Sequence, residues 1–180
     1  ALCGCGGGET AEPIITKTEI QVENGKLTPE IMHQLGKVSD PQLSPDGTRI
    51  LYGVTYTSIE QNKGNRELYL MNLDGSNNVK ITATPKSESN ARWISDSQII
   101  YMRGGKLYTA SLNGTTLSSE IEVAGAEGME GFELSPAGDK IMFIKSVKAA
   151  VKPADLYPDL DKSSGRTYTD LMYRHWDHFV

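Results

Sequence analysis

A turn followed by a strand recurs three times in this chain, and this repeat constrains the fold more than any other feature. The first copy is Leu43-Ser-Pro-Asp-Gly-Thr-Arg-Ile-Leu-Tyr52, and altered copies occupy residues 93–101 and 134–143. The aromatic residues that end the copies stand at positions 52, 101 and 143, so the steps are 49 and 42 residues. Periods of this size are typical of solenoids and propellers.

Each part of the repeat has a structural role. Pro45 presets φ at the second position of a tight turn, Asp46 can bond to the backbone, and Gly47 can adopt the positive φ that closes the turn. The apolar run up to Tyr52 has the composition of a buried strand. Trp93 replaces the leucine of the other copies, which predicts a core position. The residues assigned to the structural repeat are Ser44, Pro45, Asp46, Gly47, Tyr52, Trp93, Tyr101, Ser135, Pro136, Gly138 and Phe143.

A second shared block extends the period. Leu68-Tyr69 with Leu73-Asp-Gly75 matches Leu107-Tyr108 with Leu112-Asn-Gly114, and a short alternating segment follows each block. Strand, strand, turn and strand within one period are the anatomy of a propeller blade. We therefore expect an all-β chain, a β-propeller fragment of about three four-stranded blades preceded by a short helix. The predicted blades cover about residues 38–85, 86–125 and 126–180.

Two further segments have local signals. Residues 14–37 read as a lead-in strand, from Ile14 to Val22, followed by a short helix with Thr28 as its cap, Pro29 in its first turn and Gly36 as its end. Residues 53–66 form a polar insertion between two strands of the first blade. An insertion of this kind predicts a protruding loop, which is either solvated or in contact with a partner. Arg103-Gly-Gly-Lys106 predicts a tight hairpin in the second blade.

Composition excludes several partners. The 180 residues carry a formal net charge of −5, which argues against a nucleic-acid or anionic-membrane surface. No run of 18 apolar residues is present, so no transmembrane segment is predicted. Both cysteines lie within the first five residues, which excludes a disulfide framework and a cysteine-based zinc site in the rest of the chain.

Residues 1–13 resemble a lipoprotein leader with a flexible tether. Leu2-Cys-Gly-Cys5 is similar to a bacterial lipobox, in which the last cysteine, here Cys5, is lipidated, and the glycines that follow would form the tether. The alternative is a leader of small residues without a function. The lipobox interpretation predicts secretion across the inner membrane and a place in the periplasm or cell envelope, with a lipid anchor at Cys5.

Motifs for catalysis are missing from this sequence. It contains no Gly-x-Ser-x-Gly nucleophile elbow, phosphate loop, dinucleotide fingerprint or His-Glu-x-x-His. Its densest polar group is Tyr173-Arg-His-Trp-Asp-His178. If this segment is a helix, His175 and His178 could bind one metal ion, but if it is a strand they would face opposite sides. The interpretation we favour is a buried Trp176 with structural polar contacts. We predict no catalytic residue, no metal and no cofactor.

The start of the repeat resembles a known family. Leu27-Thr-Pro-Glu30 and Leu35-Gly-Lys-Val-Ser-Asp-Pro-Gln-Leu-Ser-Pro-Asp-Gly47 are similar to the beginning of the propeller in secreted bacterial serine peptidases of the prolyl oligopeptidase family. Within that family the resemblance is to dipeptidyl-peptidase and acylaminoacyl-peptidase-like members. Asp155-Leu-Tyr-Pro-Asp-Leu160 and Asp170-Leu-Met-Tyr-Arg-His-Trp-Asp177 resemble the same subfamily. The resemblance spans residues 27–180.

The resemblance implies a function. In that family a propeller of seven or eight blades caps an α/β-hydrolase domain that carries the catalytic serine, aspartate and histidine and follows the propeller in sequence. This chain would then be the N-terminal propeller portion of a cell-envelope serine peptidase. It would gate and shape the access of peptide substrates to the hydrolase domain of the same polypeptide, and alone it would be inactive. The segment with Tyr173, His175, Trp176 and Asp177 is a candidate domain interface.

Two alternatives remain. The chain could be part of a non-enzymatic, Tol-type periplasmic propeller that binds proteins, whose repeats share Ser-Pro-Asp-Gly turns. The 180 residues could also be a complete protein, but three blades would leave strand edges and one face uncovered. The isolated chain is therefore expected to be poorly soluble or oligomeric. The family's double-glutamate segment, which holds a substrate's amino terminus in some dipeptidyl peptidases, is not evident, so the cleavage specificity stays open.

Overall fold

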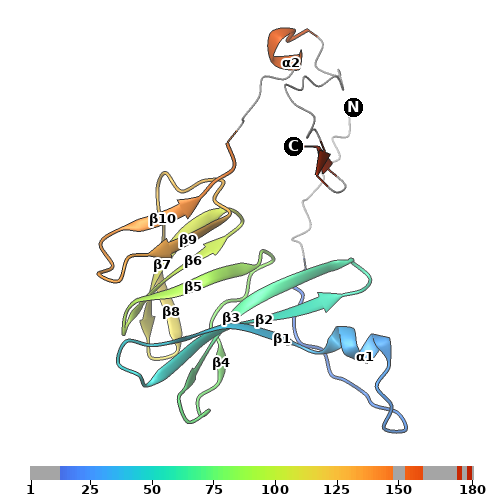
Figure 1. The fold of residues 1–180 in the computed structure, drawn as a ribbon. Helices are drawn as coiled ribbons and strands as arrows, with labels where there is room; N and C mark the ends of the chain where they lie inside the picture. The colour runs from blue at the N-terminus through green and yellow to red at the C-terminus, as the bar shows by residue number, and fades with distance from the viewer. Residues whose placement is uncertain (1–12, 148–152, 160–173, 176–177, 180) are drawn as a thin grey trace, which may run out of the picture. The chain divides into compact units, whose positions relative to one another are not determined.

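The computed structural model describes residues 13–147, 153–159, 174–175 and 178–179. The chain divides into two compact units, residues 1–145 and residues 146–180, and each is described by itself. The first unit contains the strands that the repeat predicts (Figure 1). In the second unit, the described elements are α2 (Pro153–Leu156) and a short pair of antiparallel strands, β11 (Arg174–His175) and β12 (His178–Phe179).

Helix α1 (Pro29–Gln34) begins as its sequence predicts. The Thr28 hydroxyl accepts a hydrogen bond from the Ile31 amide at 3.4 Å, and Pro29 occupies the first turn. The role expected for Gly36 was wrong, because the helix ends before Leu35 in extended backbone. Gly36 instead lies against strand β2 (Arg49–Ser58), where an added Cβ would meet Val54 and Tyr56 at 2.9 Å. The glycine is required there for close packing.

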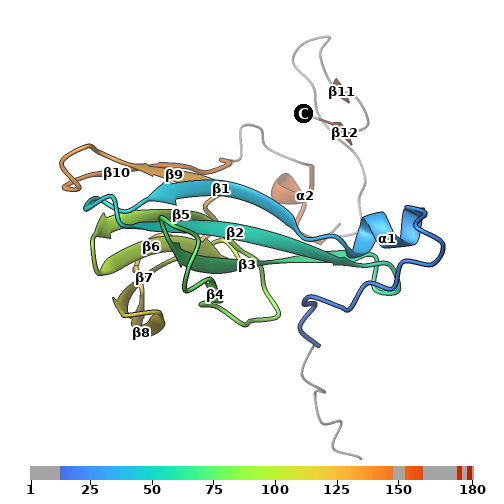
Figure 2. The same cartoon turned by 90° about the horizontal axis from the view of Figure 1, so that it is seen from below.

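Two four-stranded antiparallel sheets form the body of the first unit. Sheet 1 has the order β1-β2-β3-β4, with β1 (Lys37–Leu43), β2 (Arg49–Ser58), β3 (Lys63–Asn72) and β4 (Val79–Lys80). Sheet 2 has the order β5-β6-β7-β8, with β5 (Glu88–Ser95), β6 (Gln98–Arg103), β7 (Lys106–Asn113) and β8 (Thr116–Glu122). Strand β5 contacts β1, β2 and β3, and the two sheets lie one over the other (Figure 2). Two such meanders in sequence confirm the predicted all-β, propeller-type fold.

A third sheet follows the same plan. In the described residues it consists of β9 (Gly131–Leu134) and β10 (Ile141–Ile144). The first two strands of each sheet pair in the same register, with Leu43 opposite Ile50, Trp93 opposite Ile99, and Leu134 opposite Ile141. The side chains of β10 are 39 to 65 % exposed, although the matching residues of β2 and β6 are mostly buried.

Two local expectations were wrong. Residues 14–22 form no strand. The insertion at residues 53–66 is not a loop, because β2 and β3 continue through it as one hairpin and remain paired from Arg49–Asn72 out to Ser58–Lys63. The polar side chains of this segment are compatible with strand pairing, because the pairing is made by the backbones of β2 and β3. The predicted tight turn of the second sheet is confirmed, with Gly104 and Gly105 both at positive φ.

Strand β6 is buried on both faces, and its side chains alternate between two cores. Ile99 and Tyr101 pack toward sheet 1 in a cluster with Leu51, Leu68, Leu70, Ala91, Ala110 and Leu112. Ile100 and Met102 pack toward the third sheet in a cluster with Leu107, Ala126, Met129 and Phe132. Sheet 2 is therefore held from both sides, as a middle blade would be.

Candidate functional site

The first strands of the two large sheets each contain one residue in the left-handed conformation at the same place. Asp40 in β1 has φ 53°, and Asn90 in β5 has φ 52°. The pairing with the next strand shifts at both positions, so each residue forms a β-bulge. Aspartate and asparagine tolerate this conformation better than other side chains. Each bulge turns a polar side chain toward the following sheet.

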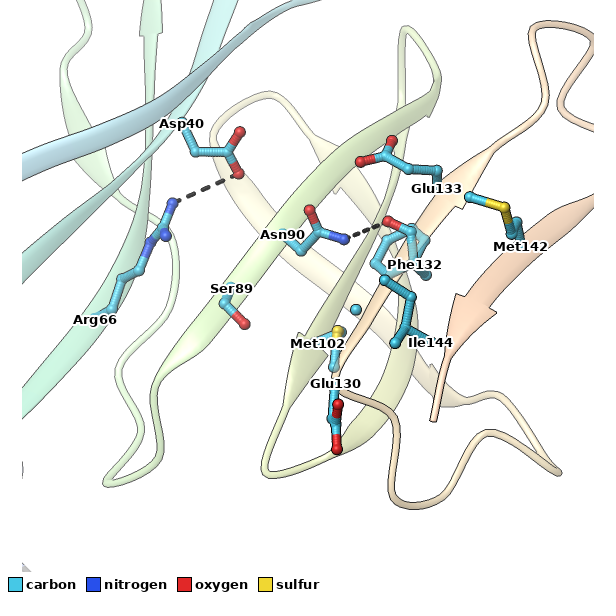
Figure 3. A pocket seen from close by; sticks show the side chains of 11 residues that line it. Asp40, Arg66, Ser89, Asn90, Met102, Glu130, Phe132, Glu133, Met142 and Ile144 are labelled. Atoms are coloured by element: carbon cyan, nitrogen blue, oxygen red, sulfur yellow. Dashed lines mark hydrogen bonds and ion pairs between the residues drawn. The ribbon is translucent and has the colours of Figure 1, made fainter. Parts of the chain in front are cut away.

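The Asp40 carboxylate forms the centre of a charged ladder across the sheets. Both of its oxygens accept from Nη1 of Arg92 in β5, at 3.1 and 3.0 Å. Arg92 in turn donates through Nη2 to Glu133 of β9 at 3.3 Å. The corresponding bond one sheet later is made by Asn90, whose Nδ2 donates to the carbonyl oxygen of Phe132 (Figure 3). Three successive first strands, β1, β5 and β9, are thus tied together by side chains.

Arg66 of β3, in the same sheet as Asp40, also approaches this carboxylate. Its Nη2 lies 3.6 Å from Asp40 Oδ2, and in the described part of the chain its buried Nε has no hydrogen-bond partner. Burial lowers the pKa of this guanidinium, and the charge of Asp40 opposes that effect. The guanidinium lies directly over Gly53, where a Cβ would come within 2.0 Å of Nε. Gly53 therefore makes room for Arg66.

A cavity of about 420 Å³ lies beside this ladder. Asp40 and Arg66 stand on one side of it, and Glu133, Phe132 and Met142 stand on the other, with Asn90 between them (Figure 3). Both sides of the cavity therefore carry charged groups, and Phe132 and Met142 add apolar surface on the side of Glu133. Such a surface can bind an extended chain through polar and apolar contacts.

The cavity has no evident catalytic machinery. Its hydroxyl-bearing side chain is Ser89, and among its lining residues no histidine or lysine stands ready as a base for that hydroxyl. The described residues contain no group of three or more histidine, cysteine, aspartate or glutamate side chains that could hold a metal ion.

The residues of the repeated turns bond to each other and to the neighbouring turn. The Ser44 hydroxyl donates to Asp46 Oδ1 at 2.6 Å, and Gly47, two residues after Pro45, has φ 71°. The Asp46 amide donates to the Asp96 carboxylate of the next sheet at 2.9 Å. In the third copy, the Ser135 hydroxyl donates to Asp139 Oδ1 at 2.8 Å, and the turn also contains Pro136 and Gly138, the latter at φ 70°.

The aromatic residues of the repeat lie in different surroundings. Tyr52 and Tyr101 are buried, whereas Phe143 is exposed in β10. Tyr52 donates from its hydroxyl to Asn78 at 2.7 Å, and Tyr101 donates to Glu120. Trp93 is partly buried against the core between sheets 1 and 2, and its Nε1 donates to the Gln42 carbonyl at 3.1 Å.

Several predicted residues lie outside the described part of the chain. They are Cys5, Tyr173, Trp176 and Asp177. The backbone of His175 is described as part of β11, but its side chain is not. Lipidation of Cys5 and the candidate interface at residues 173–177 therefore remain predictions. Within the described residues, no helix is both long and apolar enough to cross a membrane.

Sequence reasoning missed the ladder residues Asp40, Arg92 and Glu133. It also missed Arg66 and Asn90, which lie beside the ladder. A signal was present: Asp40 and Asn90 are 50 residues apart, as are Asp46 and Asp96 in the turns. An alignment continued toward the N-terminal side of each turn would have placed Asp40 and Asn90 at one structural position. Their shared tolerance of positive φ would then have suggested the bulge.

The comparisons with known proteins agree with the fold. The chain is 40 % identical over 157 residues to dipeptidyl-peptidase 5 of Porphyromonas gingivalis, and this match covers 86 % of the chain and 23 % of that protein. It is 32 % identical over 168 residues to dipeptidyl-peptidase 5 of Porphyromonas endodontalis, covering 91 % of the chain and 24 % of the relative. The chain thus spans about a quarter of the length of these curated relatives. No protein-family model matches it.

A solved structure shows a similar fold. The acylaminoacyl peptidase of Pyrococcus horikoshii superposes with a TM-score of 0.50 at 19 % sequence identity, over 62 % of this chain and 18 % of the peptidase. At this identity the likeness concerns the fold alone. It supports the propeller-type arrangement of sheets 1 and 2 independently of the sequence repeat.

Proposed function

The chain is homologous to one part of the prolyl oligopeptidase-family peptidases, and on this premise we propose that it is an N-terminal propeller portion of such a peptidase. The observation that carries the proposal is the 40 % identity over 157 residues to a dipeptidyl-peptidase 5. Because the match covers 23 % of that relative, the rest of a peptidase of this type would include the α/β-hydrolase domain with the catalytic residues.

The function of this portion is to gate and shape the access of peptides to the hydrolase domain. Support comes from the ladder of Asp40, Arg92 and Glu133 along the first strands, which in a propeller line the central channel. Charged side chains and a cavity at this place are suited to contact a peptide on its way to a catalytic domain. Without that domain, the chain binds peptides but does not hydrolyse them.

A direct test compares the chain with the polypeptide of which it is a part. The longer polypeptide should release dipeptides from chromogenic dipeptidyl substrates, and acetylation of the substrate's amino terminus should abolish this activity if the enzyme is a dipeptidyl peptidase. The isolated chain should be inactive toward both substrates. A parent polypeptide without a hydrolase domain, or one that hydrolyses no peptide, would refute the proposal and favour a non-enzymatic propeller that binds proteins.

The gating role has a separate test. Arg92→Lys keeps the charge but has one nitrogen in place of the two that bind Asp40 and Glu133 together. The ladder is then loosened, so in the parent peptidase the variant should raise the cleavage rate of long peptides relative to a dipeptidyl substrate. The matched control is Lys106→Met, which removes an exposed ion pair with Glu122 inside sheet 2. An unchanged ratio in Arg92→Lys would count against gating.

The proposed location is the periplasm or cell envelope, with a lipid on Cys5 as the anchor. It rests on the similarity of Leu2-Cys-Gly-Cys5 to a lipobox. Metabolic labelling with a fatty acid should mark the protein when it is produced with its native upstream sequence in a bacterium. The Cys5→Ala variant should lose the label and leave the membrane fraction. Unlabelled wild-type protein would disprove the anchor.

A further inference from the structure

Two glutamates are completely buried where sheets 1 and 2 meet. Glu67 belongs to β3 of sheet 1, Glu88 begins β5 of sheet 2, and both are 0 % exposed. Glutamate is rarely buried in this way unless it is paired or neutral, because an ionised carboxylate loses its hydration. Neither residue belongs to the charged ladder or to the repeated turns, so their burial needs a separate explanation.

The Thr82 hydroxyl bridges the two carboxyl groups. Thr82 Oγ1 lies 2.8 Å from Glu67 Oε2 and 3.0 Å from Glu88 Oε2, and it also accepts a hydrogen bond from the Leu68 amide at 2.8 Å. A threonine hydroxyl has a single hydrogen to donate. If both glutamates are ionised, this hydrogen serves one of them, and the other oxygen faces the hydroxyl without a hydrogen between them.

A second threonine hydroxyl also has two acceptor oxygens nearby and one hydrogen to donate. Thr84 Oγ1 lies 2.7 Å from Glu88 Oε1 and 2.6 Å from the carbonyl oxygen of Lys86, and it can donate to one of these oxygens. A proton on Glu88 supplies a missing hydrogen. Glu67 has another donor, because Asn65 Nδ2 donates to its Oε1 at 3.0 Å. The extra proton is therefore expected on Glu88.

The charges around the pair do not reverse this conclusion. Burial raises the pKa of Glu88 to about 7 despite the hydrogen bonds from Thr84 and Thr82, with a smaller upward contribution from the charge of Glu67. Burial also raises the pKa of Glu67. The ionisable groups nearby include Tyr69 on β3, Lys80 on β4, Lys86 in the connection before β5, Tyr101 and Arg103 on β6, and Glu120 on β8.

Arg103 is the cation that could keep Glu88 ionised. Its Nη1 lies 3.7 Å from Glu88 Oε1, which is too long for a hydrogen bond. The guanidinium is already engaged by Glu120, with Nη1 at 3.0 Å from Oε2, and it lies 4.2 Å from the ring centroid of Tyr108. Arg103 therefore stabilises an ionised Glu88 only weakly.

We propose that Glu67 and Glu88 share one proton near neutral pH, and that loss of this proton weakens the contact between sheets 1 and 2. When the pair loses its proton, two negative charges remain buried side by side and a hydroxyl hydrogen is lacking. The cost falls on the contact between the sheets, since each carboxyl belongs to a different sheet. The proposal does not depend on the proposed function.

The direction of the pH effect follows from linkage. The folded chain binds this proton more tightly than the unfolded chain, because the pKa of Glu88 is raised from 4.5 to about 7. The stability that this group contributes is therefore greatest at low pH and is lost as the pH rises from about 4.5 to 7. Between pH 6 and pH 8, this group alone lowers the folding equilibrium constant about tenfold.

The test measures unfolding by urea at several pH values on the full chain. The wild type should lose about tenfold in the folding equilibrium constant between pH 6 and pH 8 through this group, whereas Glu88→Gln should lack that part of the dependence. The matched control is Glu133→Gln, which also alters a contact between sheets but one that is largely exposed. It should keep the wild-type dependence. A Glu88→Gln variant with the full wild-type dependence would overturn the proposal.

Two further measurements do not need a glutamate variant. Carbon-13 NMR of labelled glutamate carboxyls should show one resonance in the native chain that titrates near pH 7, well above the others. In a Trp176→Phe background, the emission of Trp93 should change over the same range, because Trp93 Nε1 bonds to Gln42 between the same two sheets. If every glutamate resonance titrates near its ordinary pKa, the shared proton does not exist.

Discussion

Substitutions of Asp40 can separate two contributions of the bulge to the free energy of unfolding. One comes from its backbone conformation and the other from its side-chain contacts. The carboxylate contacts Arg92 at 3.0 Å and Arg66 at 3.6 Å, and it accepts from Gln42 Nε2 at 3.0 Å. Without it, Arg66 loses its counter-charge and Arg92 retains Glu133 at 3.3 Å, and both arginines are about four-fifths buried. Hydrogen bonds to charged groups contribute about 1.5–3 kcal/mol each when buried. Since Asp40 is about a quarter exposed, we expect a loss of about 2 kcal/mol for the side chain, less than for a fully buried pair.

The backbone adds a second term. Asp40 has φ 53°, and alanine in the left-handed conformation costs about 1 kcal/mol or somewhat more, whereas glycine adopts it freely. Asp40→Ala should therefore lower the free energy of unfolding by about 3 kcal/mol and Asp40→Gly by about 2 kcal/mol. Asp40→Asn keeps an acceptor and the tolerance of positive φ, so it should lose about 1 kcal/mol.

The assay is equilibrium unfolding in urea, which leaves ion pairs unscreened, with midpoints compared at a common slope. The control is Asn24→Ala, which places alanine at φ 56° in an exposed turn and should cost no more than about 1 kcal/mol. If Asp40→Gly is as stable as the wild type, the side-chain contacts of Asp40 contribute nothing to stability and that part of the reasoning is refuted. Equal losses in Asp40→Ala and Asp40→Gly would refute the backbone term.

Two further substitutions test the packing. Leu51→Ala removes a fully buried side chain of the core between sheets 1 and 2 and should lower the free energy of unfolding by about 3 kcal/mol. Its control is Leu43→Ala, at a position 56 % exposed, which should lose less than about 1 kcal/mol in the same urea titration. Gly53→Ala should cost about 1–3 kcal/mol because its Cβ would displace the guanidinium of Arg66. In Gly64→Ala the nearest atom to the added Cβ is at 3.4 Å, so stability should be nearly unchanged; a similar loss in both glycine variants would contradict the role of Arg66.

The features that sequence reasoning predicted are those with a local physical cause. The Thr28 cap and Pro29 define a helix start within a few residues, and two consecutive glycines at 104–105 define a tight hairpin. The repeat of Leu43–Tyr52 was visible because each sheet uses the same type of turn and the same apolar strand after it. In each of these cases the determining residues are neighbours in the chain.

The features that were missed depend on partners far away in sequence. The 53–66 extension has a loop-like polar composition, and its strand pairing is visible only when β2 and β3 lie side by side. Glu67 and Glu88 would be assigned to the surface by their charge alone. Their burial depends on Thr82, Thr84 and Asn65, which are brought together by the contact between sheets. Asp40 and Arg92 likewise meet across 52 residues.

The burial of β6 on both faces has a consequence for how its alignment in the sheet is specified. Ile99 and Tyr101 serve one core, and Ile100 and Met102 serve the other, so a slip by one residue would exchange one apolar set for another. In a strand with one solvent-exposed face, such a slip would move apolar side chains into water. In β6, burial of apolar side chains alone would barely disfavour it. The polar tip of Tyr101, held by Glu120, and the glycine turn after Arg103 have no equivalent one residue away. These few polar and turn contacts select the native alignment of a strand whose apolar side chains would accept two.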